Sequence, residues 1–182
     1  MQDIAVFASV TLILAYVSRA SLRRPGSHGF YRFFAWECML ALFVLNMHDW
    51  NDAACPAYQL VSGLLFATSL LLVLLGYGQL QLSGTPDPGR HDGPMLGFEK
   101  TTTLVTSGIY RYIRHPIYSS LLFLCWGFFF KQPTLAGSLL AILASGLLVA
   151  TARTEERENI HYFGDQYRSY MKKTRMFLPF IV

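Results

Sequence analysis

Five long apolar runs divide this sequence, and they restrict what the chain can fold into more than any other feature does. The runs fall at residues 4–18, 33–47, 57–82, 116–130 and 133–152. A helix needs about 17–25 largely apolar residues to cross the hydrocarbon core of a membrane. The first, second and fourth runs are shorter, but Arg19, Arg32 and Lys131 beside them can extend their long side chains to the membrane surface. The pattern therefore predicts about five membrane-spanning helices.

The composition excludes an ordinary soluble domain. Hydrophobic residues make up 53% of the chain and charged residues only 14%, whereas about a quarter of the residues in a typical globular protein are charged. The mean hydropathy is +0.34. We therefore predict an all-α fold, a polytopic membrane helical bundle of about five transmembrane helices.

The Lys and Arg residues predict how this bundle is oriented. Fourteen of the fifteen lie between the first and second runs, between the third and fourth, or after the fifth, and only Lys131 lies on the other side. Because cytoplasmic loops carry an excess of Lys and Arg, we expect the N-terminus outside and the C-terminus in the cytoplasm. The net charge of +4 then reflects topology and attraction to anionic membrane lipid, and we expect no nucleic-acid partner.

A polar segment at residues 108–118 stands at the entrance of the fourth run. It carries Arg111, Arg114 and His115 together with three tyrosines. Side chains that are costly to desolvate must face water or bind an anion at such a position. Pro116 lacks a backbone N–H and fits the first turn of the helix that follows. The alternative is that the two arginines only fix the membrane topology.

A second polar cluster closes the fifth run. Glu155 and Glu156 follow the run and lead into the aromatic segment 161–167. Both clusters lie at predicted cytoplasmic helix ends, so we expect them to form one shared site. The alternative is that the glutamates only pair with Arg153 or Arg157 along the helix surface.

The organisation of the chain follows from these features. Residues 1–82 hold the first three runs, residues 83–107 form a cytoplasmic loop rich in Pro and Gly, and residues 108–182 hold the last two runs and the predicted site. Apolar residues recur at helical spacing over 160–171 and predict a C-terminal amphipathic cytoplasmic helix. Gly164 in its middle means that the helix either breaks there or packs closely against another segment.

Several of these residues together resemble a known family. The pieces, in order, are Arg114-His115-Pro116 with Tyr118, then Glu155-Glu156, then Phe163-Gly164 with Tyr167 and Tyr170, and finally Pro179. This order is similar to that of the isoprenylcysteine carboxyl methyltransferases and the related bacterial phospholipid methyltransferases. The resemblance covers residues 106–179, and the first three apolar runs carry no matching motif.

The resemblance implies an integral-membrane enzyme, expected in a bacterial inner membrane, that binds S-adenosyl-L-methionine on the cytoplasmic side. This cofactor carries a carboxylate, an ammonium group and an adenine ring, which call for a cation, a carboxylate and an aromatic or apolar wall. The cations of the motif would bind the carboxylate, the glutamates would bind the ammonium group or the ribose, and the aromatic residues would form the walls. The expected cofactor residues are Tyr110, Arg114, His115, Tyr118, Glu155, Glu156, Phe163 and Tyr167.

We assign catalysis to Arg114 and Glu37. An acidic residue inside a membrane-spanning run is a candidate functional residue, although Glu37 can also pair with Arg32 or Arg19. Methyl transfer is an in-line displacement that mainly requires alignment and the exclusion of water. A carboxylate acceptor needs no base, whereas an amine or thiol does, and Glu37, His91 or a tyrosine would then have to serve.

We expect the acceptor to be a lipophilic or small molecule, because the chain offers no charged receptacle for a large soluble substrate. Ser120 stands where the family commonly has Gly, and Asn159 stands where it commonly has Leu; Asn159 indicates a pocket different from one for prenylcysteine. Two other classes stay open, a membrane NADPH-dependent reductase related to the sterol reductases and a non-enzymatic membrane adaptor. No metal is expected, because the cysteines lack ligand spacing.

Overall fold

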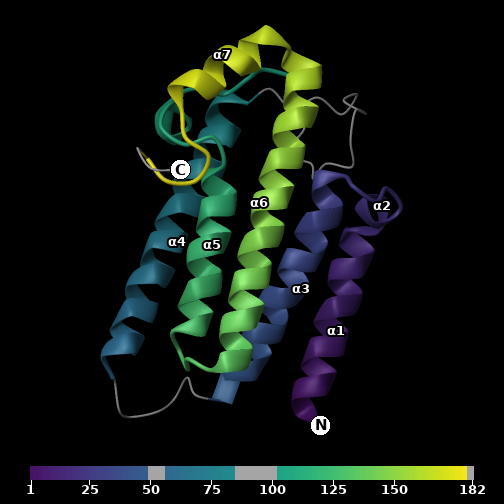
Figure 1. Cartoon of the computed structure of the whole chain (residues 1–182), viewed down its shortest axis with the longest axis vertical. Helices are drawn as coiled ribbons and strands as arrows, with labels where there is room; N and C mark the ends of the chain where they lie inside the picture. Colours follow the sequence, from purple (N-terminus) through teal and green to yellow (C-terminus); the bar gives the residue numbers. More distant parts are fainter. Residues whose placement is uncertain (49–55, 85–101, 180–182) are drawn as a thin grey trace.

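The computed structural model describes residues 1–48, 56–84 and 102–179, which form helices joined by connecting segments (Figure 1). Within these ranges no β-strand occurs, and the only sheet-like feature is a single bridge between Ile113 and Arg175. The all-α class predicted from the sequence is confirmed for this part of the chain. The elements are α1 (Gln2–Val17), α2 (Arg19–Leu22), α3 (His28–Asn46), α4 (Ala57–Ser83), the 3₁₀-helix η3 (Gly108–Arg111), α5 (Pro116–Phe129), α6 (Leu135–Phe163) and α7 (Asp165–Lys173).

The long helices run side by side along the molecule (Figure 1). Helix α3 packs against α6, α4 packs against α5, and α5 connects the two pairs by contacting both α6 and α3. Helix α1 lies along α3 at one edge of the bundle. The short helices α2 and α7 lie at the same end, where α7 turns back over the ends of its neighbours.

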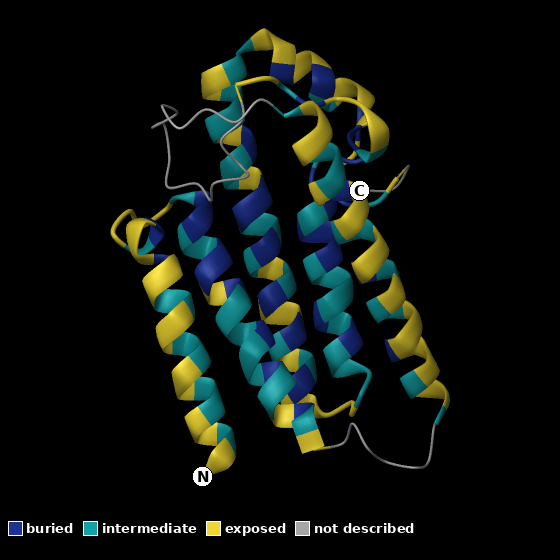
Figure 2. Cartoon of the chain, turned by 180° about the vertical axis from the view of Figure 1, so that it is seen from behind, coloured by how far each residue is buried: buried dark blue, intermediate teal, exposed yellow. Residues whose placement is uncertain are grey.

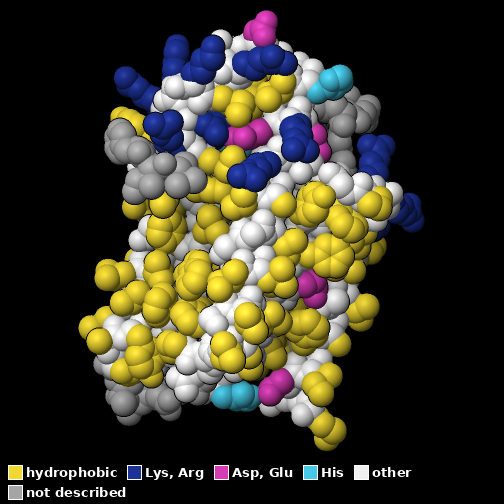
Figure 3. All heavy atoms as spheres, viewed as in Figure 1, with side chains coloured by type: hydrophobic (Ala, Val, Ile, Leu, Met, Phe, Trp, Pro, Cys, Tyr) yellow, Lys and Arg dark blue, Asp and Glu magenta, His cyan; other side chains and the backbone are white. Residues whose placement is uncertain are grey.

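The surface of the bundle is apolar in the middle and basic at one end. Helices α4 and α6 are each long and apolar enough to cross a membrane, with mean hydropathies of 2.2 and 2.1, and α1 and α5 are apolar but shorter. Figure 3 shows hydrophobic side chains over the middle of the molecule, whereas Lys and Arg side chains gather at the end where α2 and α7 lie. This distribution is typical of a protein that crosses a membrane.

Small side chains let α3, α5 and α6 approach one another in the centre. Cys125 of α5 and Ala141 and Ala144 of α6 are fully buried there, in one cluster with Leu42 of α3. Figure 2 shows that the buried residues lie on the inward faces of these helices and the exposed residues on their outward faces. Close packing of small residues is the usual means by which helices associate in a membrane, where lipid is as apolar as a leucine side chain.

Two serines tie α4 to α5. The Ser62 hydroxyl donates to the carbonyl oxygen of Gly127 at 2.8 Å, and the Ser69 hydroxyl donates to that of Ser120 at 2.7 Å. A Cβ on Gly127 would lie 2.5 Å from the ring of Phe66 on α4, so this position accepts only glycine without a shift of the ring. These contacts hold α4 beside the helix that begins at the predicted site.

Helix α6 continues beyond the fifth apolar run and ends at Phe163. Gly164 follows it with φ +58° and ψ −132°, a left-handed conformation that residues with a side chain rarely adopt. A Cβ at Gly164 would meet no atom within 4 Å. Of the two alternatives that the sequence leaves open at Gly164, the helix break is therefore confirmed. Residues 160–171 form the last turn of α6 and the first two turns of α7 rather than one continuous helix.

The segment after α7 runs parallel to the segment that precedes α5. The Arg175 N–H donates to the Tyr112 oxygen at 3.0 Å, the Arg114 N–H donates to the Arg175 oxygen at 2.8 Å, and the His115 N–H donates to the Met176 oxygen at 3.1 Å. The sequence did not predict this pairing. It fixes the end of the described chain against the Arg-His-Pro motif.

Most of the predicted cytoplasmic loop, including His91, falls at 85–101 and lies outside the described residues. The loop and the division of the chain at 1–82, 83–107 and 108–182 therefore stay predictions.

Candidate functional site

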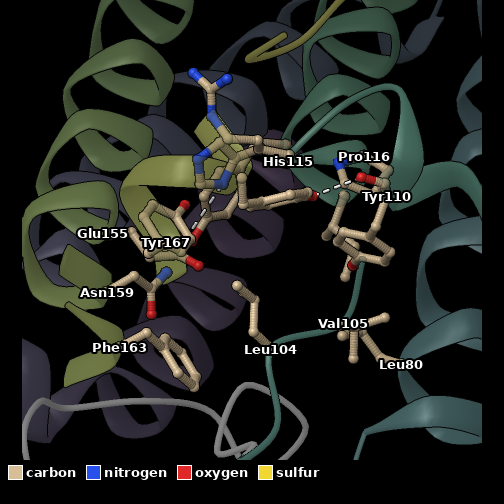
Figure 4. Close-up of a pocket in the computed structure, with 14 residues that line it drawn as sticks. Leu80, Leu104, Val105, Tyr110, His115, Pro116, Glu155, Asn159, Phe163 and Tyr167 are labelled. Atoms are coloured by element: carbon tan, nitrogen blue, oxygen red, sulfur yellow. Dashed lines mark hydrogen bonds and ion pairs between the residues drawn. The ribbon is translucent and has the colours of Figure 1, made fainter. Parts of the chain in front are cut away.

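A cavity opens at the basic end of the bundle, between the start of α5, the end of α6 and α7 (Figure 4). The space between its lining atoms, including the open mouth, is about 700 Å³. The lining residues are Leu80, Leu104, Val105, Tyr110, Arg114, His115, Pro116, Ile117, Tyr118, Glu155, Asn159, Phe163, Tyr167 and Tyr170.

Arg114 joins three segments at the wall of this cavity. Its Nε donates to Oε1 of Glu156 on α6 at 2.6 Å, and its Nη1 donates to the backbone oxygen of Thr174 at 2.6 Å. The Arg114 and Glu156 side chains are only 9% and 8% exposed. Removing one partner of a buried ion pair is strongly destabilising, because the other charge is left without compensation. Arg114 therefore holds the start of α5, the end of α6 and the C-terminal segment in one arrangement.

His115 lies within 4 Å of both Glu155 and Glu156. Its Nδ1 is 3.9 Å from Oε2 of Glu155, and its Nε2 is 3.4 Å from Oε1 of Glu156. The imidazole ring stacks on Tyr118 with the ring centroids 5.4 Å apart and an interplanar angle of 14°. Pro116 begins α5, as the sequence predicts, so the helix start presents both His115 and Tyr118 to the cavity.

One face of α6 presents Glu155, Asn159 and Phe163 to the cavity (Figure 4), since residues four apart in a helix lie on one face. Tyr167 of α7 is buried beside them and shares a side-chain hydrogen bond with Asn159. Burial raises the pKa of the Tyr167 phenol, and the charges of Glu155 and Glu156 raise it further. The phenol is therefore protonated at neutral pH and can donate a hydrogen bond.

The opposite wall of the cavity is apolar. Leu80 at the end of α4 and the residues Leu104 and Val105 line it (Figure 4). Helix α4 comes close to α5 at this level, because a Cβ on Gly76 would lie 3.1 Å from the ring of Pro116. The cavity thus combines a charged and aromatic wall with an apolar wall. Such a site can hold a ligand with charges of both signs and a ring beside an apolar group.

The structure brings most of the predicted cofactor residues together. Glu156 does not line the cavity, because it pairs with Arg114 behind the wall. Glu37, the second predicted catalytic residue, lies away from the cavity, where its Oε2 accepts a hydrogen bond from the Thr11 hydroxyl of α1 at 2.8 Å. The functional roles of these residues stay predictions. The predicted residues that do line the cavity are Tyr110, Arg114, His115, Tyr118, Glu155, Phe163 and Tyr167.

Some lining residues were not assigned from the sequence. Leu80 belongs to the third apolar run, in which nothing distinguishes a cavity residue from a packing residue. Leu104 and Val105 stand among threonines in the predicted loop 83–107, where no pattern marks them as cavity residues. Tyr170 could have been found, because it belongs to the family motif; its hydroxyl donates to the backbone oxygen of Tyr110 at 2.6 Å. Burial raises the pKa of this phenol as well.

In the part of the chain that the structure describes, no group of three or more His, Cys, Asp and Glu side chains could hold a metal ion. Cys38 is partly buried and Cys125 is fully buried, and neither takes part in a disulfide there.

Comparison with known proteins places the chain in a family. The model of the phospholipid methyltransferase family matches residues 58–166, which is more than half of the chain and includes the cavity residues from α4 through Phe163. The chain therefore belongs to the phospholipid methyltransferase family.

Two kinds of characterised proteins are similar to it. Over 123 residues the chain is 34% identical to the protein-S-isoprenylcysteine O-methyltransferase of Mus musculus, covering 64% of this chain and 42% of that protein. Over 72 residues it is 38% identical to the methanethiol S-methyltransferase of Mycobacterium tuberculosis, covering 39% of this chain and 28% of that protein. The chain thus spans less than half the length of these relatives. No solved structure matches it significantly.

Separating Arg114 from Glu156 should destabilise the fold. Arg114→Gln or Glu156→Gln alone is expected to cost about 3–5 kcal/mol, because each leaves the other charge buried and unpaired. The double substitution should lower the free energy of unfolding by less than the sum of the two single substitutions, and the difference should be at least about 1 kcal/mol. Unfolding of the full chain by SDS in mixed micelles gives the free energies for this cycle.

The pair Asp165 and Arg168 on α7 provides a control cycle. Its atoms are 3.7 Å apart and both side chains are largely exposed, so we expect no measurable coupling between Asp165→Asn and Arg168→Gln. The structural role given to Arg114 would be contradicted if the substitutions at Arg114 and Glu156 lowered the free energy of unfolding additively and by no more than the substitutions at this exposed pair.

Proposed function

We propose that this chain is an integral-membrane methyltransferase that uses S-adenosyl-L-methionine and acts on a small or lipid-like acceptor at the cytoplasmic interface. The proposal is carried by the cavity in which Arg114 and His115, at the start of α5, face Glu155 on α6. Membership of the phospholipid methyltransferase family supports the reaction class.

The residues of the cavity fit this cofactor. Arg114 already donates to Glu156 and Thr174, so we assign the carboxylate of the cofactor first to His115. Glu155 carries the opposite charge within the same wall and is assigned to the ammonium group. Aromatic side chains surround the remaining space and suit the adenine ring and the sulfonium group: Tyr110, Tyr118, Phe163, Tyr167 and Tyr170.

When it is bound, the cofactor supplies an electrophilic methyl group. The chain positions the methyl donor and the acceptor and excludes water from the site. Holding a donor and an acceptor in line removes much of the entropic part of the barrier. The buried rings of Tyr118 and Tyr167 limit the access of water to the inner part of the cavity. We propose that Arg114 contributes by fixing this geometry. A catalytic role for Glu37 stays a prediction, since its carboxylate contacts Thr11 instead of the cavity.

The acceptor that we propose follows from the apolar wall. The names of the two relatives give a protein-bound isoprenylcysteine and methanethiol as the molecules on which those proteins act. In this chain, Leu80, Leu104 and Val105 favour an acceptor that is small or carries an apolar tail, with its carboxylate, amine or thiol directed to the charged wall.

We also propose that α1, α3, α4, α5 and α6 cross the membrane and that α7 lies at its cytoplasmic surface. The apolar middle and the basic end of the bundle support this orientation, with the N-terminus outside, the C-terminus in the cytoplasm and the cavity at the cytoplasmic level. We expect the membrane to be a bacterial inner membrane.

Calorimetric titration of the purified full chain tests the proposed cofactor. S-adenosylhomocysteine should bind and NADPH should not. His115→Ala and Glu155→Gln should each weaken the binding of S-adenosylhomocysteine by about 1–3 kcal/mol, because a charged group of the ligand loses its partner. His48→Ala and Asp3→Asn are matched controls, since both side chains are exposed and neither lines the cavity.

The other outcomes of this titration are equally informative. Binding of NADPH alone would support the membrane reductase instead, and binding of neither compound would support the adaptor. Equal losses in the cavity variants and in the control variants would contradict the assignment of the cavity.

Reporter fusions test the membrane orientation. Fusions after residues 26, 55, 89, 132 and 182 are expected to report inside, outside, inside, outside and inside, because Lys and Arg lie almost entirely on one side. A fusion after residue 55 that reports inside would contradict the arrangement of five spans.

A further inference from the structure

A second hollow lies beside the C-terminal segment, and the proposed function does not use it. Its space, including the open mouth, is about 560 Å³. Among the described residues, none lines both this hollow and the first cavity. Its lining residues are Arg111, Tyr112, Lys172, Lys173, Arg175 and Pro179, and we call it the basic hollow.

The fold builds the basic hollow from two distant segments. The Arg175 N–H donates to the Tyr112 oxygen, and the Arg114 N–H donates to the Arg175 oxygen. This parallel pairing brings Arg175 beside the segment that carries Arg111, and the end of α7 adds Lys172 and Lys173. The backbone hydrogen bonds therefore fix the two segments side by side, and the four cations of these segments and of α7 line one hollow.

Within the described part of the chain, no acidic side chain balances the charges of the basic hollow. Four of the six described residues that line it are cationic and none is acidic. Among the described residues, no ion pair involves Arg111, Lys172, Lys173 or Arg175, whereas Arg114 pairs with Glu156 and Arg168 with Asp165. Four like charges around one space repel one another, and a bound anion removes that repulsion. Topology alone requires cations on this side of the membrane, but it does not require them to surround a hollow.

The position of the hollow indicates where the anion comes from. Directly after Arg175, the chain contacts the apolar bundle. Phe177 packs with Tyr118 and Ala152 there, and Leu178 packs against the same cluster. The hollow therefore borders the level at which the apolar part of the bundle begins. Phosphate groups of phospholipids lie at this level of a membrane, and basic pockets on the cytoplasmic side of membrane proteins bind anionic head groups.

We propose that the basic hollow binds the phosphate group of an anionic phospholipid, with Arg111 and Arg175 donating to the phosphate oxygens and Lys172 and Lys173 adding charge. Arginine suits phosphate because its planar group donates two parallel hydrogen bonds. The site is separate from the proposed methyl-transfer cavity and does not depend on that function. The backbone from Tyr112 to Arg114 separates the two sites.

Ligand titration of the full chain in detergent tests this proposal. The probes are dioctanoyl phosphatidylglycerol, dioctanoyl phosphatidylcholine and inorganic phosphate, and native mass spectrometry counts the bound molecules. We expect phosphatidylglycerol to bind at least about ten-fold more tightly than phosphatidylcholine, because only its head group has a net negative charge. The double variant Lys172→Gln/Arg175→Gln should reduce this preference at least about ten-fold. The double variant Arg111→Gln/Lys173→Gln removes the other two cations and should reduce it to the same extent.

Arg23→Gln/Arg24→Gln is the matched control, since it removes the same charge from exposed positions beside α2 at the same end of the molecule. The control should change the preference less than about two-fold. If inorganic phosphate binds as tightly as phosphatidylglycerol, and only the hollow variants lose this binding, the phosphate site is supported with free phosphate as the ligand. Equal binding of the two lipids without phosphate binding, or equal losses in the control, would overturn the proposal.

Discussion

The buried ion pair between Arg114 and Glu156 is the constraint on which the rest of this structure depends. The same guanidinium donates to the backbone of Thr174, so one side chain connects the start of α5, the end of α6 and the segment after α7. A buried charge requires its partners in place. One set of contacts therefore fixes the geometry of the cavity, the backbone pairing of residues 112–115 with 175–176, and the basic hollow beside this pairing.

The ion pair also gives the adjacent residues Glu155 and Glu156 different positions in the site. Successive residues of an α-helix point about 100° apart, and of these two glutamates only Glu155 lines the cavity. Glu156 turns to Arg114, and Glu155 stays at the cavity wall with Asn159 and Phe163. His115 lies between the two carboxylates. In the proposed cofactor site, Glu155 is thus the glutamate that we assign to the ligand, and Glu156 is the one that stabilises the wall.

Much of this arrangement can be predicted from the sequence, whereas the parts that follow no side-chain pattern cannot. The apolar runs predict the helices, Pro116 predicts the start of α5, and Gly164 predicts a possible break, because each follows from local chemistry. The pairing of the C-terminal segment could not be predicted, since it uses backbone groups that every residue carries. The cavity wall at Leu80 could not be predicted either, because an apolar residue that lines a cavity resembles one that packs in a core.

The central claim is that one cavity at the cytoplasmic end holds the methyl donor between α5, α6 and α7. A crystal structure of the full chain grown from lipid with S-adenosylhomocysteine tests it most directly. We expect the ligand carboxylate within hydrogen-bonding distance of His115, its ammonium group at Glu155, and its adenine ring among Tyr118, Phe163 and Tyr167. A ligand bound outside these residues, or one whose ammonium group lies against a cation of the wall, would contradict this assignment.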